Sequence, residues 1–347
     1  PARFYFWVHL PGSALAVRRW WPEMDVRVLV TGATGFLGKA VLQRLGARGV
    51  GQGRSPARCA ALNTEGLDIV QWVLPGPPPD CASLAQVDSV VHCAALSSPF
   101  GRFEDFHAAN VLATQSVLDF ARSRGVKRFV FISSPSIYFA LADQLNVSED
   151  MPLPLPFTPY AQTKIAAEQL VEKTAEVGSI ILRPRGIYGP GDSALLPRLL
   201  KAARTRTLPR FRQGRARIDL TFVDDVVEAV LMALDARQDL NGKAFNISGG
   251  EVLPISEIVE KTCHRAGIAP RWRSMPLAPA MLAARLAETF ELMRLEPREP
   301  VVTRYGLGLF AFKQSLDISR ARDILGWMPQ VRFADGLERV FDHGELR

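Results

Sequence analysis

The feature that most restricts the fold of this chain is a strand, a glycine turn and a helix near its start. The run "VRVLVT" (26–31) is short, apolar and β-branched, as expected of a buried parallel strand. The turn "GATGFLG" (32–38) follows, and "KAVLQRLGARG" (39–49) has the pattern of an amphipathic helix that ends at a glycine. Gly32, Gly35 and Gly38 allow a tight turn, and they let a pyrophosphate approach the backbone at a helix N-terminus. In this context the glycines predict a dinucleotide-binding domain.

The alternation of strands and helices continues through the first half of the chain. Long helices are expected at 104–125 and 159–178, each ending at a glycine, and further strands at 50–54, 67–74, 87–95, 127–134 and 179–184. This order predicts an α/β fold, a Rossmann doubly wound parallel sheet over residues 24–185. Prolines and basic residues then interrupt this alternation of strands and helices. Strands and helices return at 219–234, 243–248 and 255–267, so residues 186–347 are expected to form a smaller C-terminal substrate-binding lobe, partly interwoven with the first domain.

Residues 1–23 do not fit this fold. They are aromatic and apolar, but their main charge, Arg18 and Arg19, follows the apolar run, whereas a signal peptide carries its charge first. Pro11 and Gly12 interrupt the run, which is also short for a membrane span. We expect an N-terminal extension outside the fold, with the working domain starting at Met24.

Composition and charge exclude other classes of protein. The 347 residues carry a net charge of +7, yet the basic residues are not interleaved with aromatic side chains as in a nucleic-acid-binding module. The four cysteines are scattered and lack partners at metal-ligand spacing, so we expect no metal, reduced thiols and a cytoplasmic location. These cysteines are Cys59, Cys81, Cys93 and Cys263.

The end of the second strand favours NADP(H) over NAD(H). An acidic residue about 20 positions after the glycine turn would bind the ribose 2′-hydroxyl of NAD. The chain has no Asp or Glu from Lys39 to Thr64, and Arg54 lies at the expected strand end with Arg58 near it. A guanidinium there is suited to bind a 2′-phosphate in a bidentate manner.

A tyrosine and a lysine in "TPYAQTK" (158–164) form a candidate catalytic pair. Tyr160 and Lys164 are four residues apart, so on a helix they point to the same side. A free phenol has a pKa of about 10, and a nearby ammonium lowers that pKa. The pair is therefore suited to acid/base chemistry, although this spacing also occurs by chance.

In combination, these segments resemble the extended short-chain dehydrogenase/reductases. The similarity runs from about Val26 to about Glu338, and its motifs keep the order of the family. Besides the glycine turn, the matching segments are "HCAA" (92–95), "NVLAT" (110–114), "FISSPSIY" (131–138), "PYAQTK" (159–164), "RPRGIYGPGD" (183–192), "TFVDDVVEA" (221–229) and "KAFNISGGE" (243–251).

The resemblance implies roles for individual residues. Tyr160 would be the catalytic acid/base, and Lys164 would lower its pKa and bind the nicotinamide ribose. Ser134 would orient the substrate oxygen, with Ser133 and Ser136 as neighbouring alternatives. The residues implied to line the cofactor, besides Tyr160, Lys164 and Arg54, are Gly32, Thr34, Gly35, Phe36, Leu37, Gly38, Ala94, Ala95, Asn110, Ser133 and Pro184. One departure is Val73-Leu74, where the family often has an acidic residue that contacts adenine.

Within the family, the chain looks like the 3β-hydroxysteroid dehydrogenase branch, which includes sterol-4α-carboxylate 3-dehydrogenases and 2-alkyl-3-oxoalkanoate reductases. The segments that carry this likeness are "ALLPRLLKAAR" (194–204), "IDLTFVDDVV" (218–227) and "LDISRARDILGW" (316–327). The branch implies an NADP(H)-dependent oxidoreductase that interconverts a secondary alcohol and a ketone on a hydrophobic substrate. Homodimers through helices such as 104–125 and 159–178 are common in the family.

Two alternatives remain open. A nucleotide-sugar epimerase or dehydratase would have an arginine where this chain has Ile218, and an asparagine near Gly186. A non-catalytic dinucleotide-binding regulator would commonly lack the tyrosine or the lysine, and both are present here.

Three further features carry weaker expectations. The apolar helix at 280–295 is expected in the core of the lobe, in preference to a pocket wall or a membrane-facing edge. The basic stretch 198–217 fits either an acidic group of a substrate or carrier, or a solvated loop. His92, in a strand motif beside the cofactor, is expected to be structural, and His107 is the other histidine considered for catalysis.

Overall fold

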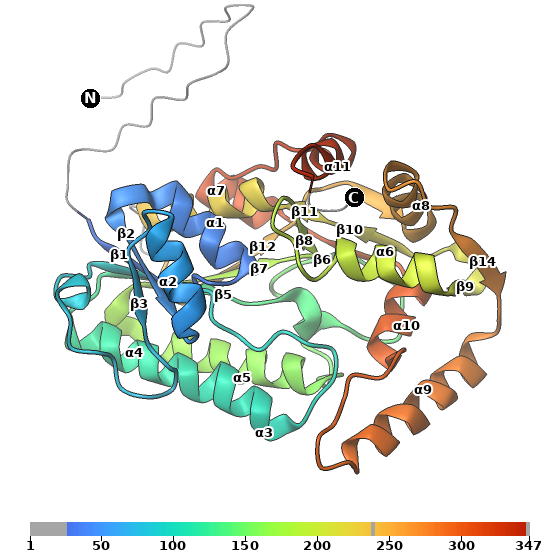
Figure 1. The fold of residues 1–347 in the computed structure, drawn as a ribbon, viewed down its shortest axis with the longest axis horizontal. Coiled ribbons are helices and arrows are strands. Elements are labelled where there is room, and N and C mark those ends of the chain that lie inside the picture. Colours follow the sequence, from blue (N-terminus) through green and yellow to red (C-terminus); the bar gives the residue numbers. More distant parts are fainter. Residues whose placement is uncertain (1–25, 237–239, 345–347) are drawn as a thin grey trace, which may run out of the picture.

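The computed structural model of the chain describes residues 26–236 and 240–344 (Figure 1). The extension expected at 1–23 therefore lies outside the described residues.

A seven-stranded sheet in which every described pairing is parallel forms the centre of the molecule. Its order, β3-β2-β1-β4-β5-β7-β12, confirms the predicted doubly wound Rossmann sheet. The strands are β1 (Val28–Thr31), β2 (Gly49–Gly53), β3 (Ile69–Gln71), β4 (Ser89–His92), β5 (Arg128–Ile132), β7 (Ser179–Pro184) and β12 (Lys243–Ile247). β12 comes from the second half of the chain, so that half contributes to the central sheet.

Helices cover both faces of the sheet (Figure 1). On one face, α1 (Phe36–Leu45) packs against α7 (Val223–Asp235). On the other lie α3 (Phe103–Phe106), a π-helical segment (His107–Leu112), α4 (Ala113–Ser123) and α5 (Pro159–Lys173), while α2 (Pro56–Thr64) joins β2 to β3. The strands in the middle of the sheet are buried on both faces, which explains their continuous apolar runs.

The N-terminus of α5 has a clear local cause. The Thr158 hydroxyl accepts a hydrogen bond from the Ala161 amide, and Pro159 occupies the first helical position, where its missing N–H costs nothing. The cap fixes where the helix begins, and hence the direction in which Tyr160 and Lys164 project.

The second half of the chain also builds a lobe beside the carboxyl ends of the strands (Figure 1). Its helices are α6 (Leu196–Thr205), α8 (Ile255–Arg265), α9 (Leu277–Leu292), α10 (Arg304–Ala311) and α11 (Phe333–Asp342). Four two-stranded pairs connect them: β10 (Arg217–Asp219) with β13 (Val252–Pro254), β11 (Thr221–Phe222) with β8 (Ile187–Tyr188), β14 (Arg271–Ser274) with β9 (Thr207–Arg210), and β15 (Gln314–Leu316) with β6 (Gln144–Val147). The predicted limits at 24–185 and 186–347 stay a prediction.

The solvated-loop interpretation of residues 198–217 is wrong. This stretch contains most of α6, strand β9 and the start of β10. The apolar residues between its arginines are what fold it, because Leu200, Ala203, Leu208 and Phe211 are buried while the arginines stay at the surface.

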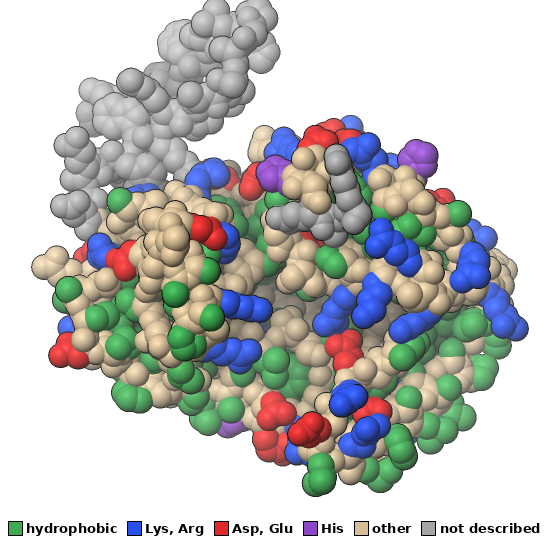
Figure 2. Space-filling model, in the orientation of Figure 1, with side chains coloured by type: hydrophobic (Ala, Val, Ile, Leu, Met, Phe, Trp, Pro, Cys, Tyr) green, Lys and Arg blue, Asp and Glu red, His purple; other side chains and the backbone are tan. Residues whose placement is uncertain are grey.

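The expectation that the helix at 280–295 lies in the core of the lobe is also wrong. It runs from Leu277 to Leu292 as α9, and among its described residues only Ala284 and Glu288 are buried. Leu282, Leu286 and Phe290, which share one side of the helix, are each about 60% exposed. Figure 2 shows hydrophobic side chains at the surface in this part of the lobe. None of the described helices combines the length and the apolar character needed to cross a bilayer.

Candidate active site

The glycine turn lies at the carboxyl end of β1 and is held from the neighbouring strand. The Gln52 side chain in β2 accepts a hydrogen bond from the Gly32 amide, 2.9 Å away, and donates one to the Trp72 carbonyl. Gly32 has a φ of +66°, and a Cβ there would lie 2.8 Å from the Ala94 backbone. A Cβ on Gly38 would lie 2.3 Å from the Gly32 carbonyl oxygen. The turn therefore requires glycine at both positions.

The helix that follows the turn leaves backbone N–H groups available to an anion. Gly35 is the N-cap of α1, no side chain caps this end, and the first turn contains no acidic residue. Together with the close backbone approach at the glycines, this arrangement fits the pyrophosphate of a dinucleotide. Thr34, Phe36 and Leu37 belong to the same turn and helix start.

Arg54 follows β2 directly, as predicted, and its side chain is exposed. It has no ion pair or hydrogen bond with any described residue, and neither does the exposed guanidinium of Arg58, one turn into α2. The hydroxyl of Ser55 instead accepts from the Arg58 amide and caps this helix. Both guanidinium groups are therefore available to a phosphate near the end of β2.

Lys164 is almost completely buried under the carboxyl end of β5. Its ammonium donates to the Ile132 carbonyl at 2.6 Å and lies 4.0 Å from the centre of the Phe131 ring. Burial lowers the pKa of Lys164 to about 7, although the carboxylate of Glu168 acts in the opposite direction. Near neutral pH this lysine can therefore exist in both protonation states.

Ser134 and Ser97 lie close enough to the Tyr160 hydroxyl to affect its pKa. Burial raises the pKa of Tyr160, and the hydroxyls of these two serines lower it in part because they stabilise the phenolate. Lys164, which we expected from the spacing to lower this pKa, has no such effect here. The structure thus places Tyr160 and Ser134 together and Lys164 one helical turn away, bonded to Ile132 instead of the phenol.

The three candidate serines after β5 have different surroundings. Ser134 is partly exposed, and its oxygen accepts from the Ser136 amide at 3.2 Å. The hydroxyls of Ser133 and Ser136 are buried without a partner among the described residues. Of the three, Ser134 is the serine whose hydroxyl lies near enough to affect the pKa of Tyr160. Pro184, at the end of β7, is buried, and the Ser133 amide donates to Leu182 in that strand.

Asn110 holds the loop that contains Ala94 and Ala95. Its side-chain oxygen accepts from the Leu96 amide, and its NH₂ group donates to the Leu96 carbonyl and to the Thr163 hydroxyl. Because both N–H groups are used, Asn110 contributes by fixing the loop at 94–98 beside α5. Its direct contact with a cofactor stays a prediction.

His92 is buried in a chain of hydrogen bonds from β1 to the π-helical segment. Its Nδ1 lies 2.6 Å from the Thr31 hydroxyl, and its Nε2 lies 3.0 Å from the Thr114 hydroxyl. Thr114 in turn donates to the Asn110 carbonyl, so it accepts from His92, whose proton is then on Nε2. Burial lowers the pKa of His92 to about 3. This geometry suits a neutral, structural histidine.

The motif analysis missed two residues of the site. Ser97 lies in the exposed loop after β4, and no motif or spacing marks it. Tyr305 lies in α10, far along the chain, yet it is close enough to Tyr160 and Arg185 that the charge of each affects its pKa. Its ring packs 4.7 Å from that of Phe139. Tertiary structure alone brings these residues to Tyr160.

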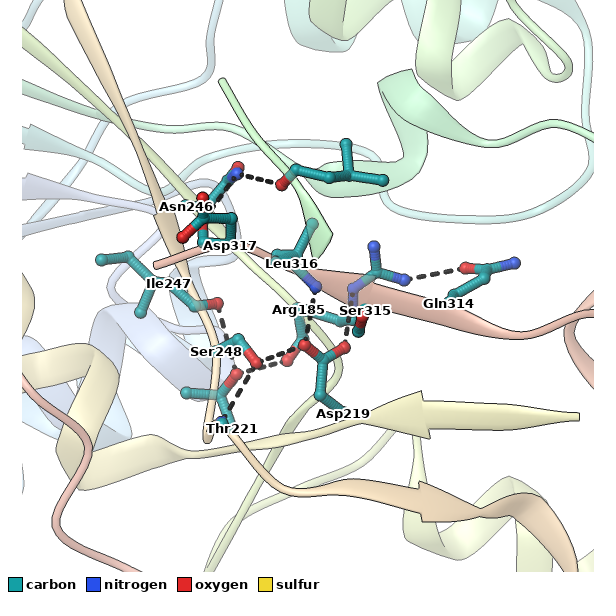
Figure 3. Close-up of polar contacts among 12 residues, drawn as sticks. Arg185, Asp219, Thr221, Asn246, Ile247, Ser248, Gln314, Ser315, Leu316 and Asp317 are labelled. Carbon is teal, nitrogen blue, oxygen red and sulfur yellow. Dashed lines mark hydrogen bonds and ion pairs between the residues drawn. The ribbon is translucent and has the colours of Figure 1, made fainter. Parts of the chain in front are cut away.

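Two arginines at the end of β7 form buried ion pairs, Arg183 within the strand and Arg185 directly after it. The Arg183 guanidinium forms a two-pronged contact with Glu168, at 2.9 and 2.6 Å. Arg185 pairs with Asp219, from Nε to Oδ1 at 3.1 Å (Figure 3). No group of three or more potential metal ligands gathers within residues 26–236 and 240–344.

Comparison with known proteins gives the same family over most of the chain. The model of the NAD dependent epimerase/dehydratase family matches residues 28–248. A 2-alkyl-3-oxoalkanoate reductase of Stenotrophomonas maltophilia (strain K279a) is 32% identical over 333 residues, which cover 91% of this chain and 98% of that protein. A decarboxylating sterol-4-alpha-carboxylate 3-dehydrogenase of Mus musculus is 29% identical over 273 residues, 74% of each chain.

A solved structure has the same architecture. The UDP-glucuronic acid 4-epimerase of Bacillus cereus, in complex with NAD, superposes with a TM-score of 0.70 and 25% identity, over 92% of this chain and 98% of that chain. These matches confirm the resemblance to the extended short-chain dehydrogenase/reductases. The chain belongs to the NAD dependent epimerase/dehydratase family.

Proposed function

We propose that this protein is an NADP(H)-dependent oxidoreductase that interconverts a secondary alcohol and a ketone on a hydrophobic substrate. The observation that carries the proposal is that Tyr160 and Lys164 lie one turn apart on α5, with Ser134, just after β5, near enough to affect the pKa of Tyr160. The names of the two relatives described above, a reductase of 3-oxo acids and a 3-dehydrogenase of sterol carboxylates, support the same chemistry.

The side chains suggest a path for the proton that is transferred to the substrate oxygen. A nicotinamide cofactor supplies or accepts the hydride when it is bound. In the direction of reduction, Tyr160 would donate its proton to the carbonyl oxygen, while Ser134 donates a hydrogen bond to the same oxygen as negative charge develops. The phenolate that remains would stabilise the ammonium form of Lys164, whose pKa of about 7 lets it respond near neutral pH.

The preference for NADP(H) is a proposal that rests on Arg54. Its exposed guanidinium has no partner among the described residues, and no acidic residue from Lys39 to Thr64 competes for a ribose hydroxyl. An Arg54→Asp variant should lose the preference for NADPH over NADH, because a carboxylate repels a 2′-phosphate and can accept from a 2′-hydroxyl. Arg273→Asp, on exposed β14, is the matched control and should keep the preference. If Arg54→Asp also keeps it, the assignment of Arg54 is wrong.

The epimerase alternative has less support in the chain. Ile218, where such enzymes are expected to have a phosphate-binding arginine, is buried and packs in the hydrophobic core. The regulator alternative is disfavoured because Tyr160 and Lys164 are both present and share one helix. The four cysteines are unpaired, which agrees with the proposed cytoplasmic location, and homodimerisation through α4 and α5 is a further proposal.

The direct test is net cofactor turnover with chemically different substrates. NADPH and NADH oxidation would be followed with 3-oxo steroids, 2-alkyl-3-oxo acids and their esters, and UDP- or GDP-sugars. Net NADPH oxidation with an apolar ketone, faster than with NADH, is the expected result. Isomerisation or dehydration of a nucleotide sugar without net oxidation would overturn the proposal.

A further inference from the structure

Arg185 is a buried cation at the carboxyl edge of the sheet, and the reaction proposed above does not use it. It follows the last residue of β7, at the carboxyl edge of the sheet, where ligands of such folds bind. The residue is 7% exposed, and its amide donates to the Ile247 carbonyl of β12. The next residue, Gly186, has a φ of +52°, and a Cβ there would lie 2.5 Å from the Leu220 side chain. The backbone at Arg185 is therefore fixed on both sides.

Two of the three guanidinium nitrogens of Arg185 are held by the protein. Nε lies 3.1 Å from Oδ1 of Asp219, and Nη1 donates to Oε1 of Gln314 at 2.8 Å. Nη2 has no hydrogen bond to any described residue, and in Figure 3 it points away from both partners. Because this nitrogen is not among the fully buried atoms, its N–H groups are available to a ligand.

Asp219 does not fully neutralise Arg185, because its carboxylate also accepts hydrogen bonds from other groups. Its second oxygen, Oδ2, accepts from the Ser248 hydroxyl at 2.6 Å and from the Leu316 amide at 3.0 Å. These donors stabilise the carboxylate independently of Arg185 (Figure 3). Asp219 thus orients Arg185, and the Nη2 edge of the guanidinium stays available.

Packed aromatic rings connect Tyr305 to the start of α5. The Tyr305 ring lies 4.7 Å from that of Phe139, and Phe139 lies 4.9 Å from Phe157, three residues before Tyr160. The Tyr305 hydroxyl is also near enough to Arg185 and Tyr160 for each to affect its pKa. This part of the chain therefore combines an apolar wall, a hydroxyl and a cation with a free donor.

We propose that Arg185 and the Tyr305 hydroxyl bind a carboxylate of the substrate, close to the carbon that is oxidised or reduced. This inference rests on the proposed function. It agrees with the names of both relatives, because each name describes a substrate with a carboxylate near the carbon that is reduced or dehydrogenated. A guanidinium is suited to this because it binds a carboxylate in a fixed plane. The binding site so defined selects hydrophobic 3-hydroxy or 3-oxo acids over their neutral analogues.

The test compares an acid with its methyl ester. A 2-alkyl-3-hydroxy acid and its methyl ester are both stable, and their oxidation with NADP⁺ would be followed for the wild type and an Arg185→Met/Asp219→Asn double variant. The double variant removes both charges of the pair, so no carboxylate is left buried alone. The wild type should prefer the acid. In the double variant, the acid-to-ester ratio of kcat/KM should fall by about 10- to 100-fold, the factor expected for one charge-assisted hydrogen bond.

Controls separate this inference from the proposed function. Arg271→Met, on exposed β14, should keep the wild-type ratio, and Arg185→Lys, which retains the charge, should keep a higher ratio than the double variant. Equal use of acid and ester by the wild type, or an unchanged ratio in the double variant, overturns the carboxylate site while the oxidoreductase function stands. If the wild type oxidises neither compound nor any other secondary alcohol, both are wrong.

Discussion

His92 should make the folded protein sensitive to acid in a way that a single substitution removes. The neutral ring accepts from Thr31 and donates to Thr114 in a fully buried position, and burial lowers its pKa from 6.5 to about 3. As the pH falls below 6.5, the unfolded chain binds a proton at this histidine and the folded chain does not, so stability is lost until the pH nears 3. Between pH 7 and pH 4.5 this histidine alone should cost roughly 2.5 kcal/mol of folding free energy, at about 1.36 kcal/mol per pH unit.

The assay is urea unfolding as a function of pH, for the wild type and for His92→Gln. Glutamine does not titrate in this range, and its amide can still bond to both threonines. Other titrating groups are common to both proteins, so from pH 7 to pH 4.5 the wild type should lose about 2.5 kcal/mol more unfolding free energy than His92→Gln. Val91→Ala, a buried neighbour without a titrating group, should give a curve parallel to the wild type. A His92→Gln curve parallel to the wild type would refute the reasoning.

Three further predictions concern the fold, the cofactor turn and the proton donor. Glu168→Gln leaves Arg183 buried without its counter-ion, so the free energy of unfolding, measured by thermal unfolding, should fall by about 3–5 kcal/mol. Glu257→Gln, in an exposed pair with Lys261, is the control and should lower it by less than about 1 kcal/mol. Equal losses in the two variants would contradict this prediction. Gly38→Ala places a Cβ against the turn and should weaken NADPH binding at least about tenfold in a fluorescence titration, and unchanged binding would contradict the proposed pyrophosphate site. Ser97→Ala removes a hydroxyl that lowers the pKa of Tyr160, so the pH profile of alcohol oxidation should move to higher pH; an unmoved profile would exclude Ser97 from the site.

The sequence was a good guide to the central sheet and to the placement of Tyr160 and Lys164 on one helix. Buried parallel strands need continuous apolar runs, and the turn at Gly32 needs a residue that tolerates a positive φ, so local sequence carries both signals. The position of Tyr160 on α5 follows from its spacing to Lys164 and from the cap at Thr158.

The rest depended on contacts between distant parts of the chain. Ser97 and Tyr305 reach Tyr160 from a loop and from α10, and neither has a periodic pattern around it. Helix α9 was misjudged because an apolar pattern shows that a helix has a hydrophobic side but not whether anything covers it. The raised pKa of Tyr160 likewise depends on its burial, which spacing alone does not reveal.

The central claim is that Tyr160 transfers the proton in a net redox reaction on a ketone. The most direct measurement is NADPH oxidation with a 2-alkyl-3-oxo acid, comparing the wild type with Tyr160→Phe, after showing by titration that both bind NADPH equally. The claim predicts stoichiometric NADPH consumption and alcohol formation by the wild type, and a rate lower by about 10²- to 10⁴-fold in Tyr160→Phe. A Tyr160→Phe variant that reduces the ketone at the wild-type rate would contradict it.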